Sequence, residues 1–345
     1  MAQSLFITLK NAHPDCQIDV LAPAWSLALL ERMPEVAKAI AMPLSHGQLG
    51  LLDRIKLGRK LRFEGYDHAI LLPNSWKSAL IPYFANIPVR TGYIGEFRWG
   101  LLNDARKLDK SLLTMTVQRF VALGLPNTAL LPPECPIPRL VINQDQQQTV
   151  IEKFKLSSHS VGRVSDSVTR QNQAPDVGLG SANPTYKTST KILALCPGAE
   201  YGAAKRWPAS YFAEVARHNI AQGWQVWLFG SDKDKAAAEQ IKNEVSGDCI
   251  DFTGWTSLAE AVDLLSLADT VVTNDSGLMH VAAALDKKII ALYGSSDPNF
   301  TPPLNTKAHV ISLNLDCSPC FKRECPLGHT RCLTDIKPGQ VIDVI

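Results

Sequence analysis

The stretch from Val271 to Leu285, VVTNDSGLMHVAAAL, constrains the fold more than any other part of this 345-residue chain. Residues 270–273 form a β-branched run of the kind found in buried strands. The next four residues, 274–277, are polar and turn-forming, and apolar residues then recur at helical spacing up to Leu285. The sequence therefore predicts a strand, a sharp turn and a helix, which together are the basic unit of an α/β domain.

The turn of this stretch places Asp275, Ser276 and Gly277 where the predicted helix begins. The first backbone N–H groups of a helix have no partner within it and carry a partial positive charge, so the turn can hold a phosphate group. His280, in the first helical turn, can face the same ligand. The alternative is an ordinary helix cap, with Asp275 or Ser276 as the capping residue.

Strands and helices alternate along the rest of the chain. We expect strands at 17–22, 66–73, 191–195, 225–229 and 288–293, a short strand and turn at 87–95, and helices at 2–10, 25–33, 78–85, 144–154, 208–221, 232–245 and 257–267. This alternation predicts α/β lobes with parallel, doubly wound sheets. Such a lobe usually begins with its central strand, whereas this chain begins with a helix, so that strand is either supplied in another way or missing.

The length of the chain suits two domains. Residues 157–190 are rich in Ser, Asn, Gln, Gly and Pro and poor in large apolar residues, so they are expected to form a flexible linker. This linker would separate an N-terminal lobe, 1–156, from a C-terminal lobe, 191–345, with a cleft between them. The net charge of +2 gives no indication of nucleic-acid binding.

The chain carries no sign of a membrane span or a leader. No apolar run reaches the roughly 18 residues that a spanning helix needs, and the first residues lack the pattern of a secretory signal peptide. We therefore expect a cytoplasmic protein. Four scattered cysteines, Cys16, Cys135, Cys196 and Cys249, fit reduced thiols in such a compartment.

Three loops of the C-terminal lobe follow predicted strands, at 198–205, 230–232 and 274–277. Because the carboxyl ends of parallel strands meet at one edge of a sheet, these loops should converge there. Lys205 and the helix start at Ser276 both suit an anionic, phosphate-bearing ligand. A lone lysine in a loop is commonly only a solvated surface charge, but its neighbouring loops favour the ligand.

In the N-terminal lobe, Asn74 and Lys77 directly follow a predicted strand, and Arg90 is expected beside the same edge of the sheet. These three residues are candidates for binding the second substrate. Residues 53–62, DRIKLGRKLR, carry five cations. They are interpreted first as a solvated helix face, and alternatively as a contact for phosphates or acidic sugars.

The motifs CPGAEYGAAKRWP, at 196–208, and TNDSGLMHVAAAL, at 273–285, resemble those of the ADP-heptose:lipopolysaccharide heptosyltransferases of glycosyltransferase family 9. Further matching stretches are APAW, RMPEV, LPNSWKSALIP, RTGYIGE, GLLND and LYGSSDPNFTPPL. The resemblance covers nearly the whole chain outside the predicted linker, and the N-terminal stretches favour the type II enzymes over type I.

The resemblance implies a GT-B fold, which has two Rossmann-like lobes with the active site between them. It implies inverting transfer of L-glycero-D-manno-heptose from ADP-heptose to the first heptose of the lipopolysaccharide inner core. The acceptor is then heptosyl-Kdo2-lipid A at the inner face of the inner membrane, and no metal or other cofactor is required. The residues that match the donor-binding motifs are Glu200, Tyr201, Lys205, Thr256, Asp275, Ser276, Gly277 and His280.

By motif position, Lys205 pairs with phosphate, Glu200 and Tyr201 lie over the diphosphate, and Thr256 lies near the adenine. Residues 275–277 and His280 surround the diphosphate and the sugar. Cations and helix-end amides at these positions would stabilise the charge that develops on the departing ADP.

The chain departs from the family at its beginning. Family members start with a strand and a loop that carries Gly-Asp, and that Asp is the proposed general base. Here the sequence starts with the following helix, so we expect the first lobe to lack its first strand and assign no catalytic base. The expectation is then a truncated chain that is unstable or inactive as written.

Three other functions stay open at the level of the sequence. The chain could be another family 9 heptosyltransferase with a different acceptor. It could be a catalytically impaired remnant that binds ADP-sugar without turnover. A two-lobed nucleotide-sugar epimerase is the third, but it would need a pair of acid/base carboxylates, and no convincing pair is found.

Four cysteines cluster near the C-terminus, at Cys317, Cys320, Cys325 and Cys332, with His329 among them. Thiolates and imidazole at such spacing suit tetrahedral zinc. A typical zinc site uses two separated pairs, however, and here all the ligands fall within 16 residues. We therefore favour reduced thiols that pack a tight loop or pair only on oxidation, and assign no metal.

Overall fold

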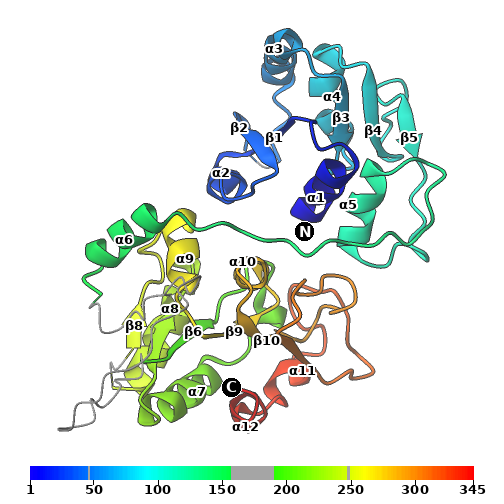
Figure 1. The fold of residues 1–345 in the computed structure, drawn as a ribbon. Helices are drawn as coiled ribbons and strands as arrows, with labels where there is room; N and C mark the ends of the chain where they lie inside the picture. Colours follow the sequence, from blue (N-terminus) through cyan, green and yellow to red (C-terminus); the bar gives the residue numbers. More distant parts are fainter. Residues whose placement is uncertain (46, 157–189, 247–248) are drawn as a thin grey trace, which may run out of the picture.

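The computed structural model describes residues 1–45, 47–156, 190–246 and 249–345. The expected linker at 157–190 therefore lies almost entirely outside the described residues. The described chain forms two α/β lobes, drawn one above the other in Figure 1. All paired strands in both lobes are parallel, as the alternation of strands and helices predicts.

The C-terminal lobe is built on a six-stranded sheet in the order β11-β10-β9-β6-β7-β8. Its strands are β6 (Ile192–Cys196), β7 (Gln225–Leu228), β8 (Cys249–Asp251), β9 (Thr270–Asn274), β10 (Lys288–Tyr293) and β11 (Ala308–Ser312). Every residue of β6 and β9 is buried. The continuous apolar runs of these strands suit the centre of a parallel sheet, which is covered on both faces.

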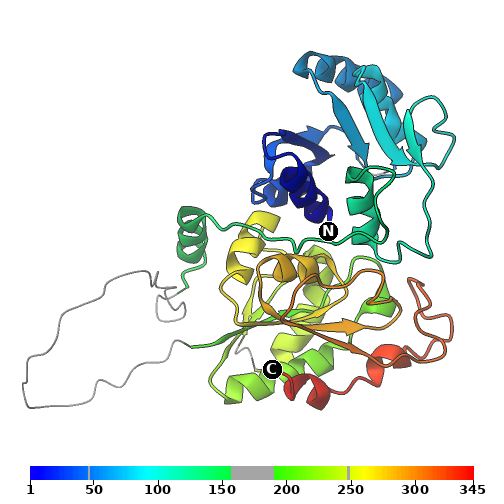
Figure 2. The same cartoon turned by 45° about the vertical axis from the view of Figure 1, so that its right-hand side comes forward.

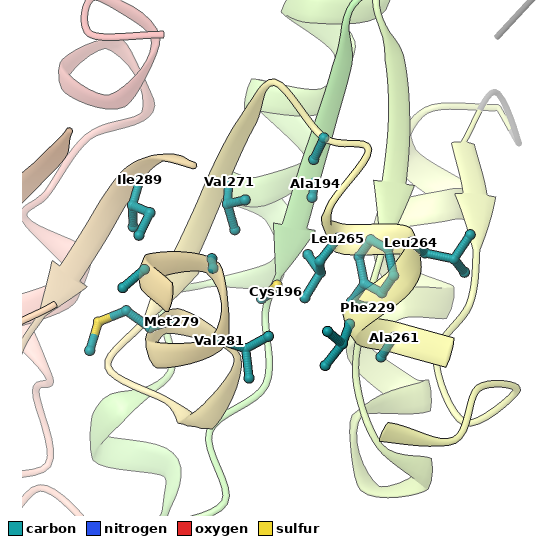
Figure 3. Packing of buried hydrophobic residues seen from close by; sticks show 14 of the residues in the cluster. Ala194, Cys196, Phe229, Ala261, Leu264, Leu265, Val271, Met279, Val281 and Ile289 are labelled. Carbon is teal, nitrogen blue, oxygen red and sulfur yellow. The ribbon is translucent and has the colours of Figure 1, made fainter. Parts of the chain in front are cut away.

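Helices cover both faces of this sheet. They are α7 (Ala209–Ala221), α8 (Lys235–Glu244), α9 (Leu258–Leu265), α10 (Gly277–Ala284), α11 (Arg331–Thr334) and α12 (Pro338–Ile342), with 3-10 turns η3 (Ala203–Lys205) and η4 (Asp232–Asp234). On one face, Val271 and Ile289 of the sheet pack against Met279 and Val281 of α10 and Leu265 of α9 (Figure 3). Each such fully buried side chain contributes about 1.5–3 kcal/mol to folding.

The N-terminal lobe contains two smaller sheets. One pairs β1 (Ile18–Pro23) with β2 (Val36–Met42), and the other has the order β3-β4-β5, formed by His68–Leu71, Val89–Tyr93 and Asp104–Arg106. The helices are α1 (Ala2–Ala12), α2 (Leu27–Leu30), α3 (Leu51–Leu61), α4 (Trp76–Phe84) and α5 (Thr116–Gly124), with 3-10 turns η1 (Ala24–Ser26) and η2 (Arg62–Glu64). Helix α1 joins the two sheets, because Leu5 and Phe6 pack in one cluster with Val20 of β1 and Ile70 of β3.

The segment 125–143 runs between the two lobes, as Figures 1 and 2 both show. On one side, Ser4 of α1 donates to Pro136 O at 2.6 Å, and on the other, Leu140 N donates to Ala284 O of α10 at 2.9 Å. The segment leads into α6 (Gln144–Lys153), which packs against α9 of the C-terminal lobe. The N-terminal lobe as expected, 1–156, therefore ends in a helix that shares the core of the other lobe.

A buried ion pair also connects the lobes. Arg32, which follows α2, donates to Asp263 of α9 at 2.6 Å, and both side chains are almost fully buried. Among the described residues, no helix is long and apolar enough to cross a membrane.

Candidate active site

The loops that follow β6 and β9 are joined by the side chain of Asn274, the last residue of β9. This buried amide donates to Pro197 O at 2.7 Å and accepts a hydrogen bond from Trp207 N at 3.0 Å. The loop after β7 lies beside them, because Gly198 of the β6 loop and Gly230 of the β7 loop both contact Asp234. A Cβ at Gly198 would come within 2.5 Å of the Asp234 carboxylate. The three loops therefore converge at one edge of the sheet, as the sequence predicts.

Lys205 and Asp275 meet at this edge. Lys205 Nζ lies 2.5 Å from Asp275 Oδ2, and the two side chains are 15% and 5% exposed. The sequence left a solvated lysine and an Asp275 helix cap open as alternatives, and neither describes this pair. The carboxylate holds the ammonium group in place at the start of α10.

The N-terminus of α10 is open to a ligand. Ser276 is the N-cap residue, but its side chain makes no capping hydrogen bond. Gly277 is exposed, and a Cβ built there would meet nothing within 4 Å. The first backbone N–H groups of the helix and the Lys205 ammonium group therefore face the same region, which favours an anion.

His280 lies one turn further along α10 and is partly buried. Burial lowers its pKa to about 4, the positive charges of the Met1 amino group and Lys205 act in the same direction, and Asp275 opposes them. The imidazole is therefore neutral at pH 7. In that form it offers a ligand one donor and one acceptor nitrogen.

The other donor-site candidates lie further out. The phenolic hydroxyl of Tyr201 donates to Phe321 O at 2.7 Å, and its ring lies 5.0 Å from Lys205 Nζ. Glu200 is exposed and paired with exposed Lys233, which lowers the pKa of the Glu200 carboxyl. Thr256 is half-buried in the loop before α9, where its hydroxyl donates to Phe252 O at 3.4 Å.

In the N-terminal lobe, Asn74 and Lys77 lie together just after β3. Asn74 Oδ1 accepts from buried Arg98 at 3.4 Å, and Lys77 Nζ donates to Gln48 O at 3.5 Å. Arg90 does not belong to this edge, contrary to our expectation. It is the second residue of β4, and its guanidinium group donates to the carbonyl groups of Ile87 and Leu101, so it lies toward the amino end of the strand.

The cationic segment 53–62 forms a mostly solvated helix face. Lys56, Arg59, Lys60 and Arg62 are exposed. Arg54 is the exception, because it is buried and donates to the carbonyl groups of Gln48, Leu49 and Lys77. It therefore supports the backbone next to Lys77.

Sequence reasoning missed three groups near these loops. It gave no role to the Asn274 side chain. It also passed over Ser295 and Ser296, whose buried hydroxyls have no hydrogen-bond partner within the described chain. The available signal was their position, because both residues follow β10 closely and so lie at the ligand-binding edge of the sheet.

Comparisons with known proteins fit this geometry. A family model for glycosyltransferase family 9 (heptosyltransferase) matches residues 54–331. The chain is 44% identical to the lipopolysaccharide heptosyltransferase 2 of Salmonella typhimurium and to that of Escherichia coli, over 99% of this chain and 92% of each relative. It is 42% identical to the lipooligosaccharide heptosyltransferase 2 of Haemophilus influenzae, over 99% and 93% of the two chains.

Solved structures of heptosyltransferases also match this chain. The structure of the E. coli ADP-heptose LPS heptosyltransferase II matches with a TM-score of 0.77 at 40% identity, over 99% of this chain and 92% of that one. The E. coli heptosyltransferase WaaC with ADP matches with a TM-score of 0.65 at 16% identity, over 99% and 96%, which supports the fold alone. The chain therefore belongs to glycosyltransferase family 9 and is a heptosyltransferase with the two-lobed GT-B fold.

Proposed function

We propose that this enzyme transfers L-glycero-D-manno-heptose from ADP-heptose to the first heptose of the lipopolysaccharide inner core, with inversion at the anomeric carbon. The names of the relatives at 42–44% identity support this assignment. The observation that carries the donor part is the Lys205–Asp275 pair at the open N-terminus of α10.

The donor diphosphate binds between Lys205 and the first N–H groups of α10. Both groups carry positive charge, and Lys205 is held by Asp275 before the ligand arrives, so little rotamer freedom is lost on binding. Tyr201 and Glu200 border this position, and Thr256 lies beyond it, toward the adenine. Residues 275–277 and His280 then lie beside the diphosphate and the sugar.

The same groups act on the leaving ADP. As the glycosidic bond to heptose breaks, negative charge grows on the departing phosphate oxygen. A fixed ammonium group and helix-end amides stabilise that charge more strongly in the transition state than in the bound donor. Neutral His280 adds a hydrogen bond without contributing a charge of its own.

The acceptor binds at the N-terminal lobe, near Asn74 and Lys77. Trp76, Phe97 and Trp99 lie nearby with exposed rings, and the loops that carry them touch, because Trp76 N donates to Glu96 Oε2 at 3.3 Å. Exposed aromatic rings beside a lysine suit an acceptor that is both a sugar phosphate and a lipid. Heptosyl-Kdo2-lipid A has this chemistry, and with this acceptor the proposed reaction takes place at the inner face of the inner membrane.

The donor part is tested by ADP binding, measured by calorimetry. Lys205→Met should weaken ADP binding by about tenfold or more, because a charge-assisted contact to phosphate is lost. Lys307→Met removes an exposed lysine just before β11, at the opposite, amino end of the sheet, and should leave the affinity within about twofold of the wild type. Equal affinities for the Lys205 variant and the wild type would exclude this donor site.

The acceptor part is tested by mass spectrometry of the lipid product. Purified enzyme and ADP-heptose are offered lipid acceptors that carry no heptose, one heptose or two heptoses. We expect addition only to the acceptor with one heptose. Addition to another acceptor would assign a different heptosyltransferase reaction, and ADP-heptose binding without any product would leave a binding protein.

A further inference from the structure

The four C-terminal cysteines line one small cavity of about 20 Å³. Their loop follows β11 and reaches α11, and all four are free cysteines. Ala204 and Ser295 complete part of the wall, and the Ser295 hydroxyl is buried without a hydrogen-bond partner among the described residues. The sequence cluster Cys317, Cys320, Cys325 and Cys332 is therefore also a cluster in space.

The thiols in this cavity are not equivalent. The backbone N–H groups of four residues that follow Cys325 donate to its sulfur and lower its pKa, and the first among them is that of Thr330. Cys332 is half-buried, and burial together with the other three cysteines raises its pKa. The cavity thus holds one thiol whose pKa is lowered and one whose pKa is raised.

Partial exposure makes Cys325 a cavity thiol that an oxidant can reach. Within the part of the chain that the structure describes, no group of three or more His, Cys, Asp or Glu side chains is set to hold a metal ion. Cys325 is partly exposed. A partly exposed thiol with a lowered pKa is the form of cysteine that oxidants attack first.

The cysteine loop also supports the donor-binding loop. Tyr201 donates to Phe321 O at 2.7 Å, and Ala204 N donates to Arg323 O at 3.0 Å. Ala204 forms part of the cavity wall, and the next residue, Lys205, is the one paired with Asp275. A change in the loop between Cys320 and Cys325 therefore reaches the ammonium group of the candidate donor site directly.

We propose that the four thiols form an oxidant-sensitive modification site whose disulfide state controls donor binding. The Cys325 sulfur attacks one oxygen of hydrogen peroxide and becomes a sulfenic acid, the O–O bond breaks, and the other oxygen leaves as water. A second thiol of the cavity then displaces that oxygen as water and forms the disulfide. In total, two thiols and one hydrogen peroxide give one disulfide and two waters.

The site itself is tested without reference to function. The full-length protein is treated with graded hydrogen peroxide, alkylated, digested and mapped by mass spectrometry. We expect a disulfide that contains Cys325 and another cavity cysteine, formed well before Cys135 reacts, because burial raises the pKa of Cys135. Cys325→Ser should abolish this fast reaction, and Cys135→Ser should not.

Two results would contradict the proposed oxidant-sensitive site. One is oxidation of the cavity thiols no faster than Cys135. The other is a stoichiometric metal ion in the purified protein that protects all four thiols from alkylation. Because the wild type alone gives both readings, the test does not depend on how well the serine variants fold.

The proposed regulation of donor binding by the disulfide state rests on the proposed function, so it is measured separately. ADP affinity is compared before oxidation, after it, and after reduction with dithiothreitol. We expect oxidation to weaken binding by about tenfold, through loss of the contacts at Tyr201 and Ala204, and reduction to restore it. Unchanged affinity of the oxidised protein would refute the control, whereas absence of ADP binding in the reduced protein would refute the donor site itself.

Discussion

The neutral imidazole of His280 makes stability depend on pH. Its pKa is lowered in the folded protein from the ordinary 6.5 to about 4, so the unfolded chain binds the proton more readily. The stability contributed by the neutral ring is complete above pH 6.5 and is lost as the pH falls toward 4. Urea unfolding at pH 7.5, 6 and 5 should therefore show a smaller decrease for His280→Gln than for the wild type, while exposed His309→Gln should follow the wild type.

The residues of the donor loops could be predicted from the sequence, because a strand followed by Asp-Ser-Gly and a helix fixes where their backbone lies. Their partners could not. Nothing local to Lys205 indicates that its ammonium group binds Asp275, which is 70 residues away. For Arg90 the predicted position itself was wrong. An arginine side chain is several ångströms long, so the sequence does not show toward which end of the strand its guanidinium group points. In the structure this group donates to carbonyl groups nearer the amino end.

Among the elements, the β9–α10 turn and the start of α7 depend on Asn274. Replacing Asn274 with Ala should leave the carbonyl group of Pro197 and the N–H group of Trp207 buried without partners. Each unsatisfied group costs about 1–3 kcal/mol, so we expect a loss of roughly 2–6 kcal/mol in urea unfolding. The Asn274→Asp variant keeps an oxygen that can accept from Trp207 N, but its second oxygen replaces the NH2 group and faces Pro197 O. This variant should therefore also be less stable than the wild type. An Ala variant within about 0.5 kcal/mol of the wild type would contradict this role.

The buried central elements were the easiest to predict. The expected strand at 288–293 coincides with β10, and Ser257 caps α9 as expected, with its hydroxyl accepting from Glu260 N. Strands β2, β5, β8 and β11 were missed, since they lie at sheet edges, are partly exposed and carry a weak apolar pattern. The helix expected at 25–33 is shorter, because residues 24–26 form the 3-10 turn η1 and α2 covers only Leu27–Leu30. After α2 the chain tightens into i→i+3 hydrogen bonds from Arg32 N to Leu29 O and from Met33 N to Leu30 O, ahead of Pro34.

At the scale of the whole molecule, the two lobes follow from the repeated strand–helix pattern, but the way they are joined does not. Helix α6 has only a weak apolar stripe, and its docking on α9 depends on Val150 and Phe154 entering a core whose first strand, β6, begins 38 residues after Phe154. Arg32 and Asp263 are 231 residues apart. No periodicity or turn signal connects such positions, so only the folded structure shows that they hold the lobes together.

The Arg32–Asp263 pair allows the connection between the lobes to be measured. Arg32→Met leaves the Asp263 carboxylate buried and unpaired, which should cost about 3–5 kcal/mol at pH 7 in urea unfolding. Burial already raises the pKa of Asp263 and Arg32 opposes that rise, so the variant should raise it further and recover stability as the pH falls toward the new pKa. This is the opposite direction to the effect of His280. The double variant Arg32→Met/Asp263→Leu removes both charges and should regain most of the loss, since an apolar pair of similar volume is often neutral. If the double variant is as unstable as Arg32→Met, packing of the long arginine side chain rather than charge joins the lobes.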